Sequence, residues 1–126
     1  MLPKPEACKG CPLYDDGMGF VPDQLVSGAD TFVLMQNPGD LEEKVGVPAV
    51  GDTGQLMNEH FIPLAQLHRT VKVDLRTNTV STDSNVSVGN VLKCRYRGED
   101  GKKGNTLPPA GILEEAVAHC THAHLK

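Results

Sequence analysis

The chain has 126 residues, which is enough for one domain with a buried core. Its formal charge is −4, so it lacks the overall basic excess of an electrostatic nucleic-acid binder, although Lys93, Arg95, Arg97, Lys102 and Lys103 leave room for a local basic groove. No apolar run approaches the roughly 20 residues that span a bilayer, and the N-terminus lacks the apolar core of a secretory signal. We therefore expect a cytoplasmic protein.

Residues 1–30 are expected to form an arm that carries a Cys-x-x-Cys pair followed by proline, Cys8-Lys9-Gly10-Cys11-Pro12. Gly10 allows a tight turn, so both sulfur atoms can reach one metal or cluster. In a reducing compartment, cysteines without a secretory signal favour metal binding over disulfides. The stretch from Leu13 to Gly28 reads as an irregular surface loop held down by the cysteines.

The apolar run from Thr31 to Met35 predicts a buried strand, because it is rich in β-branched and aromatic residues. Residues 36–52 are rich in glycine, proline and acidic residues, and we expect them to form a loop. Pro38 forces a turn, and Gly39 can take a positive φ. A strand that leads into such a loop and then into a helix builds ligand sites in open α/β sheets. This loop is therefore the expected working surface.

A helix is expected over about residues 53–68, with Pro63 causing a kink or break near Ile62. Its predicted apolar face carries Leu56, Phe61, Leu64 and Leu67. His60 and His68 are expected on the surface or edge of this helix rather than as metal ligands, because no second ligand lies at metal spacing.

The second half of the chain predicts one more firm strand and one helix. Residues 71–74 alternate like a short strand, and 75–85 predict a loop or an exposed hairpin. Residues 86–92 predict a strand whose carboxyl end carries Asn90, whose amide can read the edge of a base. A charged loop follows at 95–105, and two prolines open a last helix near residue 110.

Four cysteines, Cys8, Cys11, Cys94 and Cys120, form a set that suits either tetrahedral zinc or an iron–sulfur cluster. Zinc ribbons use two Cys-x-x-Cys pairs, whereas this chain has one pair and two single cysteines, so the pattern favours a cluster. His119, His122 and His124 lie near Cys120 and leave a mixed zinc site open.

Taken together, these blocks resemble the iron–sulfur (family 4) uracil-DNA glycosylases of the uracil-DNA glycosylase superfamily. That family has C-x-x-C-P-L, matched by residues 8–13, and N-V-V-K-C-R, matched by residues 90–95. Between them, G-E-A-P-G-x-x-E-D-x-x-G-x-P-F-V-G-x-A-G-x-L-L aligns without a gap to residues 35–57, and the family's final cysteine corresponds to Cys120. The match runs in order over nearly the whole chain.

The resemblance implies an α/β fold, a partial doubly wound, three-layer α/β/α arrangement with a short parallel sheet and a cysteine-bearing N-terminal arm. Residues 1–126 would form a single domain, incomplete relative to the family. The resemblance also implies a [4Fe–4S] cluster, with zinc as the alternative. Its ligands would be Cys8, Cys11, Cys94 and Cys120.

The implied activity is DNA repair: the enzyme flips uracil out of DNA and hydrolyses its N-glycosidic bond. The resemblance places catalytic positions at Gln36, Asp40 and Glu42. It places substrate-binding positions at Asn37, Pro38, Gly39, Ala49 and Asn90.

The chain departs from the family pattern at three points. Gln36 replaces a glutamate, Ala49 replaces a phenylalanine that would stack on uracil, and nothing here corresponds to the family's later strands and histidine-bearing loop. An unpaired sheet edge would need a cover or a partner. The alternative function is therefore a non-catalytic iron–sulfur or zinc accessory module that binds DNA or a replication or repair protein such as a polymerase. Such a module could act in the cytoplasm of a virus-infected cell.

Overall fold

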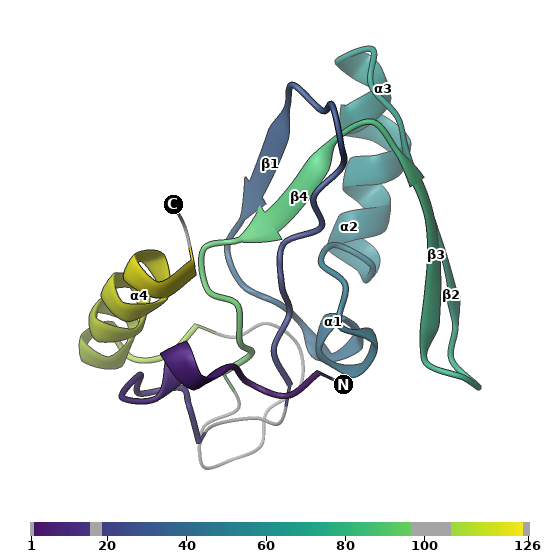
Figure 1. Cartoon of the computed structure of the whole chain (residues 1–126). Helices are drawn as coiled ribbons and strands as arrows, with labels where there is room; N and C mark the ends of the chain where they lie inside the picture. Colours follow the sequence, from purple (N-terminus) through teal and green to yellow (C-terminus); the bar gives the residue numbers. More distant parts are fainter. Residues whose placement is uncertain (1, 16–18, 97–106, 125–126) are drawn as a thin grey trace.

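The computed structural model describes residues 2–15, 19–96 and 107–124 of a mixed α/β protein (Figure 1). None of the described helices is long and apolar enough to cross a membrane. In chain order the elements are η1 (Glu6–Cys8), β1 (Phe32–Met35), α1 (Asp40–Val45), α2 (Asp52–Leu56), η2 (Met57–Phe61), α3 (Ile62–Leu64), β2 (Arg69–Asp74), β3 (Thr79–Ser84), β4 (Ser87–Asn90) and α4 (Ala110–His124).

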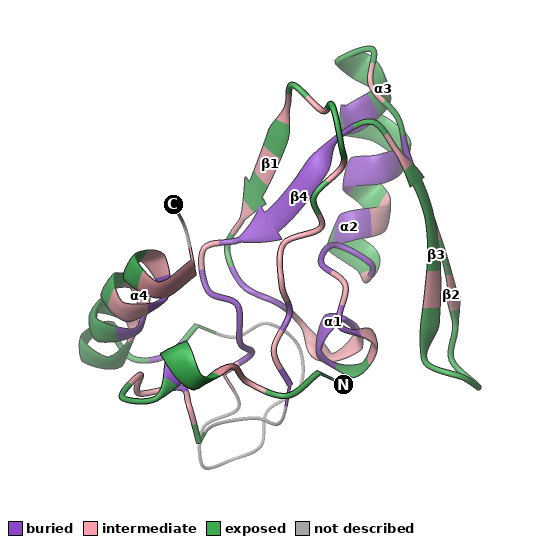
Figure 2. Cartoon of the chain, viewed as in Figure 1, coloured by how far each residue is buried: buried purple, intermediate pink, exposed green. Residues whose placement is uncertain are grey.

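The two strands that the sequence predicts most firmly, β1 and β4, pair in parallel. Met35 lies opposite Asn90 in this register, so both strands end at the same edge of the sheet. All of β4 is buried, whereas β1 alternates between exposed and half-buried residues (Figure 2). On its other side, β4 makes an isolated antiparallel bridge between Val88 and Gln24. The buried strand β4 therefore lies between β1 and the segment around Gln24.

The apolar core consists of two clusters. One lies between the sheet and the helical rod formed by α2, η2 and α3, and it contains Ala49, Met57, Ile62, Val86 and Val88. The other joins the N-terminal arm and the segment after β4 to α4, and it contains Leu13, Leu92, Cys94, Ala116 and Cys120.

The segment predicted to be a loop at 36–52 contains a short helix, α1, which the sequence analysis missed. Three acidic residues lie in its first turn, where the partial positive charge of the helix N-terminus stabilises them. Gly46 ends the helix in a left-handed conformation with φ of 75°. The glycine- and proline-rich composition of residues 36–52 predicts a loop, although six of these residues form a helix.

The predicted apolar face of the rod was wrong at three of its four positions, whereas Leu67 is half-buried and packs against the core. Leu56, Phe61 and Leu64 are exposed, and the buried positions include Met57 and Ile62. Met57 and Ile62 are five residues apart, and the wider turn of the π-helical η2 brings both onto the buried side.

The described part of Leu13 to Gly28 is irregular, as predicted, but the prediction that it lies on the surface was wrong for some of its residues. Leu13 is 2% exposed and Val21 is fully buried. The Val21 amide donates to the carbonyl of Lys93 over 2.7 Å. The arm therefore packs along the segment that follows β4.

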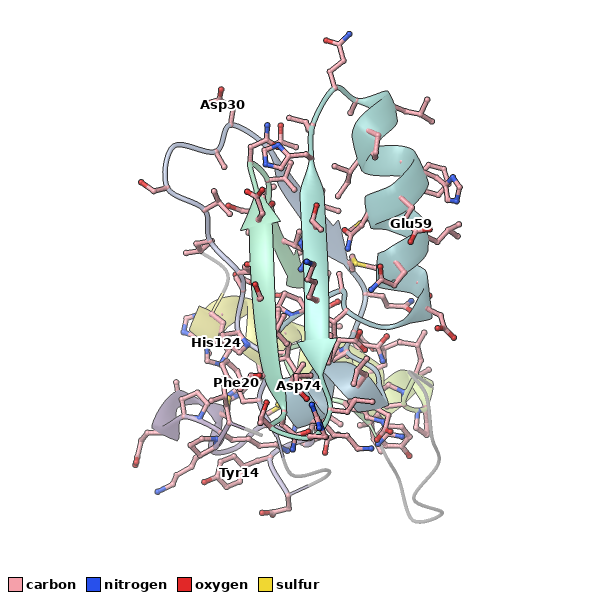
Figure 3. All side chains as sticks on the ribbon, turned by 90° about the vertical axis from the view of Figure 1, so that its right-hand side faces the viewer. Tyr14, Phe20, Asp30, Glu59, Asp74 and His124 are labelled. Atoms are coloured by element: carbon pink, nitrogen blue, oxygen red, sulfur yellow. The ribbon has the colours of Figure 1, made fainter. Side chains whose placement is uncertain are left out.

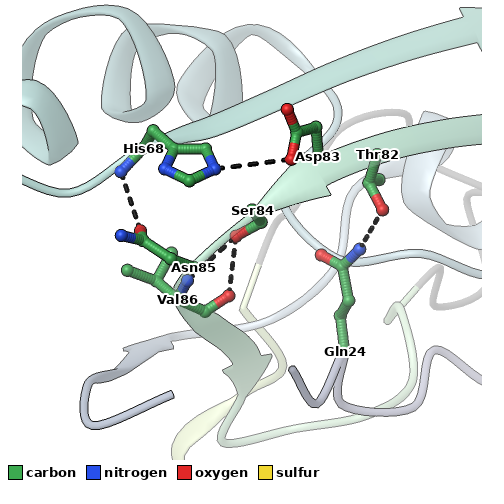
Figure 4. Close-up of polar contacts among 7 residues, drawn as sticks. All are labelled: Gln24, His68, Thr82, Asp83, Ser84, Asn85 and Val86. Atoms are coloured by element: carbon green, nitrogen blue, oxygen red, sulfur yellow. Dashed lines mark hydrogen bonds and ion pairs between the residues drawn. The ribbon is translucent and has the colours of Figure 1, made fainter. Parts of the chain in front are cut away.

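Residues 69–84 form a two-stranded antiparallel hairpin, β2 and β3, which confirms the expectation of an exposed hairpin and extends the strand predicted at 71–74. Val73 pairs with Val80 on the half-buried face, and Lys72 with Ser81 on the exposed face. Figure 3 shows the hairpin in front of the rest of the chain, with Asp74 at the end of β2. Its base is held by polar contacts, including Gln24 to Thr82 and the amide of His68 to Asn85 (Figure 4).

Candidate functional site

A pocket of about 390 Å³ opens at the carboxyl ends of β1 and β4. Met35 and Asn90, the last residues of the two strands, both line it. A ligand site at this edge is what parallel strands predict. Of the residues named from the sequence, the pocket brings together Asn37, Gly39, Asp40, Glu42, Ala49 and Asn90.

Two of the predicted site residues do not line the pocket. Gln36 is exposed, and its carbonyl accepts a hydrogen bond from the amide of Leu92 at 3.0 Å. Pro38 is fully buried in the turn between β1 and α1. Both positions therefore fix the course of the chain around the pocket.

The carboxylate of Glu42 organises the loop on both sides of the pocket. Its Oε1 accepts the amide of Gly39 at 2.9 Å. Its Oε2 accepts the amides of Val50 at 2.9 Å and Gly51 at 2.5 Å. Glu42 is 9% exposed, so these bonds form with little access for water. Three backbone donors occupy the carboxylate, which gives it a structural task.

Asp40 is an accessible carboxylate of the pocket, with 40% of its side chain exposed. Its Oδ1 lies 3.2 Å from Nη1 of Arg95, and its Oδ2 lies 3.4 Å from Nζ of Lys44. Arg95 is 3% exposed and also lies 3.7 Å from the buried carboxylate of Glu43. Two cations thus hold Asp40 in place at the pocket wall.

Asn90 has a buried side-chain donor without a described partner at the edge of the pocket. The residue is 2% exposed and lines the pocket, and its Nδ2 has no hydrogen-bond partner within the part of the chain that is described. Buried amides are nearly always hydrogen-bonded, because leaving a donor unpaired costs about 1–3 kcal/mol. A ligand with an acceptor atom would satisfy this donor.

Arg69, at the start of β2, holds the wall of the pocket, and no pattern in the sequence indicates this role. Its guanidinium donates to the carbonyls of Pro48 at 2.7 Å and Ala49 at 2.8 Å, and also to Asn58 and Gln24. Ala49 has a φ of 56°, a left-handed conformation that costs a non-glycine residue about 1–2 kcal/mol. Burial lowers the pKa of Arg69 to about 10, with Glu42 opposing the shift, so the side chain stays charged at neutral pH.

The four cysteines line a second, small cavity, together with Leu13, Tyr14, Leu92 and Lys93. Cys8, Cys94 and Cys120 are buried, Cys11 is half-buried, and all four are free thiols. Within the described residues, no group of three or more His, Cys, Asp or Glu side chains forms a ready-made site for a metal ion. The chain thus gathers thiols from its N-terminal arm, the segment after β4 and α4 around one space.

Burial raises the pKa of the thiols of Cys8, Cys94 and Cys120 when no metal is bound. The pKa of Cys94 rises to about 12, and those of Cys8 and Cys120 also rise, with the neighbouring thiols adding to the effect. The ammonium of Lys4 opposes the shift at Cys8 and Cys94. Metal binding would have to displace these protons, so metal affinity should increase with pH.

The residues present fit an iron–sulfur cluster by their chemistry. Such clusters take four cysteine thiolates and are tuned by hydrogen bonds to the sulfur atoms. The backbone amide of Lys93 donates to Sγ of Cys120 at 3.4 Å, and Nε2 of His124 lies 3.1 Å from Sγ of Cys8. By its chemistry, the set of four cysteines is therefore of the kind that a cluster takes.

Of the three histidines near Cys120, His124 is the one with a described contact to a thiol. The centroid of its ring lies 5.0 Å from that of Phe20, and both residues are labelled in Figure 3. Nε2 of His119 instead lies 2.8 Å from the carbonyl of Ala7, and His122 is exposed. A mixed zinc site would draw on His124 first.

The segment from Asn90 to Arg95 connects the pocket to the cysteine cavity. Asn90 lines the pocket and Cys94 lines the cavity, while Arg95 reaches back to Asp40. Lys93 is 2% exposed, and its ammonium lies 2.6 Å from Oδ1 of Asp23. Lys93 and Arg95 are thus buried in ion pairs and unavailable for a basic groove. The other basic residues of that predicted cluster, Arg97, Lys102 and Lys103, lie outside the described residues.

No family model matches the chain, and a search of curated proteins finds no match either. The family resemblance therefore stays a prediction, carried by the sequence blocks.

Proposed function

We propose that the chain is a uracil-DNA glycosylase-like iron–sulfur protein that binds an extruded base of DNA, with excision of uracil as its activity. The observation that carries the proposal is the unpaired, buried amide of Asn90 in a pocket at the carboxyl ends of two parallel strands. The partial doubly wound, three-layer α/β/α arrangement is part of the same proposal, since mixed α/β structure with a short parallel sheet is compatible with it.

The proposed chemistry is hydrolysis of an N-glycosidic bond. The Nδ2 amide of Asn90 would donate to a carbonyl of the base and so hold the base in the pocket. Asp40 would orient a water molecule, because its carboxylate is accessible and is held by Arg95 and Lys44. The bond between the sugar and the base breaks, the water oxygen bonds to the sugar carbon, and a proton goes to the base.

We propose that Cys8, Cys11, Cys94 and Cys120 hold a [4Fe–4S] cluster, with zinc as the alternative. A bound cluster would join the arm, the segment after β4 and α4 through covalent bonds. Since Asn90 lies four residues before Cys94, the cluster would also fix the backbone that presents Asn90 to the base.

A specific observation supports the alternative, a non-catalytic accessory module that binds DNA or a replication or repair protein. Glu42 is occupied by three backbone amides, and Gln36 lies outside the pocket. Of the described residues that line the pocket, none is basic, so no lining side chain would stabilise an anionic leaving base by charge.

Anaerobic purification tests the proposal, followed by iron, sulfide and zinc assays and by measurement of uracil release from single- and double-stranded oligonucleotides. Iron and sulfide at cluster stoichiometry, with uracil release that Asn90→Ala abolishes, would support it. Asn90→Asp is the matched variant, because it keeps the shape of the side chain and removes the donor. Binding of DNA without base release would favour the accessory module. One zinc per chain, with neither uracil release nor DNA binding, would refute both the cluster and the glycosylase function.

A further inference from the structure

We infer that the pocket selects a base of purine size that carries a carbonyl group, an oxopurine, over uracil. The inference rests on the proposed function, that the pocket receives an extruded base, and it names the class of that base. Three features of the pocket carry it: its volume, the backbone that forms part of its wall and the charge of its walls.

The pocket is larger than a single ring requires. A cavity of about 150 Å³ accommodates benzene, a six-membered ring of nearly the size of uracil. The pocket here measures about 390 Å³, more than twice that volume. Uracil would leave much of this space to water, whereas the two fused rings of a purine would fill more of it and bury more apolar surface.

One part of the pocket wall is formed by backbone at positions that carry no side chain or only a methyl group. Gly39, Ala49, Gly51 and Gly54 all contribute to the walls. A Cβ atom at Gly54 would lie 2.2 Å from the carbonyl oxygen of Ala49, so packing keeps this position without a side chain. Ala49 is itself held by the hydrogen bond from Arg69 to its carbonyl. This part of the wall therefore cannot move inward around a small base by a rotamer change.

The charge of the walls also favours a purine. Asp40, Glu42 and Asp52 line the pocket, and the described lining residues include no cation. Uracil leaves as an anion, which nearby carboxylates destabilise. An oxopurine has an additional ring nitrogen, N7, that accepts a hydrogen bond or a proton beside the O6 carbonyl. The amide of Asn90 has two N–H groups to offer to these acceptors.

Fluorescence anisotropy of labelled single-stranded oligonucleotides tests the inference. The probes carry one hypoxanthine, one uracil or only normal bases at the same position in the same sequence. We expect the hypoxanthine probe to bind at least tenfold more tightly than the uracil probe, and Asn90→Ala to weaken the binding of both probes.

Thr53, exposed at the mouth of the pocket, provides a size test that leaves the core untouched. Thr53→Tyr should narrow the pocket and shift the preference toward uracil by about tenfold, while the matched Thr53→Ser should leave it unchanged. Equal or tighter binding of the uracil probe to the wild-type protein would overturn this inference and leave the proposed function standing. If neither modified probe binds more tightly than the unmodified one, the proposed base pocket fails as well.

Discussion

The carboxylate of Glu42 accepts hydrogen bonds from the amides of Gly39, Val50 and Gly51, which lie on both sides of the pocket. At the scale of single residues, this is the contact that closes the loop between β1 and α2. The resemblance assigns a catalytic position to Glu42, whereas the hydrogen bonds give it a structural one. The two roles predict different consequences for a substitution.

We expect Glu42→Ala to lower the free energy of unfolding by about 3 kcal/mol, because it leaves three backbone donors without their acceptor in a poorly hydrated site. Chemical denaturation measures the change. Glu59→Ala is the matched control, since Glu59 is exposed on the rod (Figure 3), and its loss should stay within about 0.5 kcal/mol. A stable but inactive Glu42→Ala protein would instead point to a direct role in the chemistry.

At the scale of elements, the rod of α2, η2 and α3 presents a different face to the sheet from the one that α-helical spacing predicts. Ile62 is 4% exposed in the core, whereas Leu64 is 80% exposed. Ile62→Ala should therefore lower the free energy of unfolding by about 3 kcal/mol. Leu64→Ala should change it by less than about 0.5 kcal/mol. Similar losses for the two variants in thermal or urea unfolding would contradict the π-helical phase of the rod.

The hairpin and the pocket wall are joined by Arg69. Arg69→Ala would leave the buried carbonyls of Pro48 and Ala49 without their donors, so we expect a loss of about 3 kcal/mol in stability. Faster hydrogen exchange should appear at the amides of Val50 and Gly51, because the loop that Arg69 holds would open more often. Arg76→Ala is the control on the same hairpin, since the side chain of Arg76 is 94% exposed. Unchanged exchange at these amides in Arg69→Ala would show that the hairpin does not support the pocket.

At the scale of the whole molecule, the sequence predicts the elements whose signal is local. The β-branched residues of β1 and β4 predict strands, and prolines before α4 predict where that helix begins. The carboxyl ends of the strands also predict the position of the pocket, because parallel pairing brings Met35 and Asn90 together. The cysteine pattern predicts that the four thiols lie together, and all four line one small cavity.

The features that the sequence did not predict depend on contacts between distant segments. Lys93 and Arg95 read as part of a basic surface, yet each is buried against an acidic partner from another part of the chain. Arg69 lies in an alternating strand pattern that carries no sign of its contacts with Pro48 and Ala49. Burial of a charge is decided by the location of its partner, and periodicity does not contain that information.

The thiols of Cys8, Cys94 and Cys120 come from the arm, the segment after β4 and α4, and they line one cavity. Their protonation therefore affects the stability of the whole molecule. Without a metal, burial raises the pKa of Cys94 from 9.0 to about 12. Between these values the unfolded chain has lost a proton that the folded chain retains. Stability should therefore be complete below pH 9 and fall as the pH rises toward 12. In the loaded protein the thiolates are already bound, and this dependence should be absent.

Thermal unfolding of the metal-free and the reconstituted protein, between pH 8 and pH 10.5, tests this expectation. The Tm of the metal-free protein should fall over this range more steeply than that of the reconstituted protein. In metal-free Cys94→Ser, whose hydroxyl does not titrate here, the fall should be shallower than in the metal-free wild type, because the other titrating groups are shared. Equal slopes for the metal-free wild type and Cys94→Ser would mean that the buried thiol does not control the stability of the fold. The cysteine cavity would then be no more than part of the apolar core.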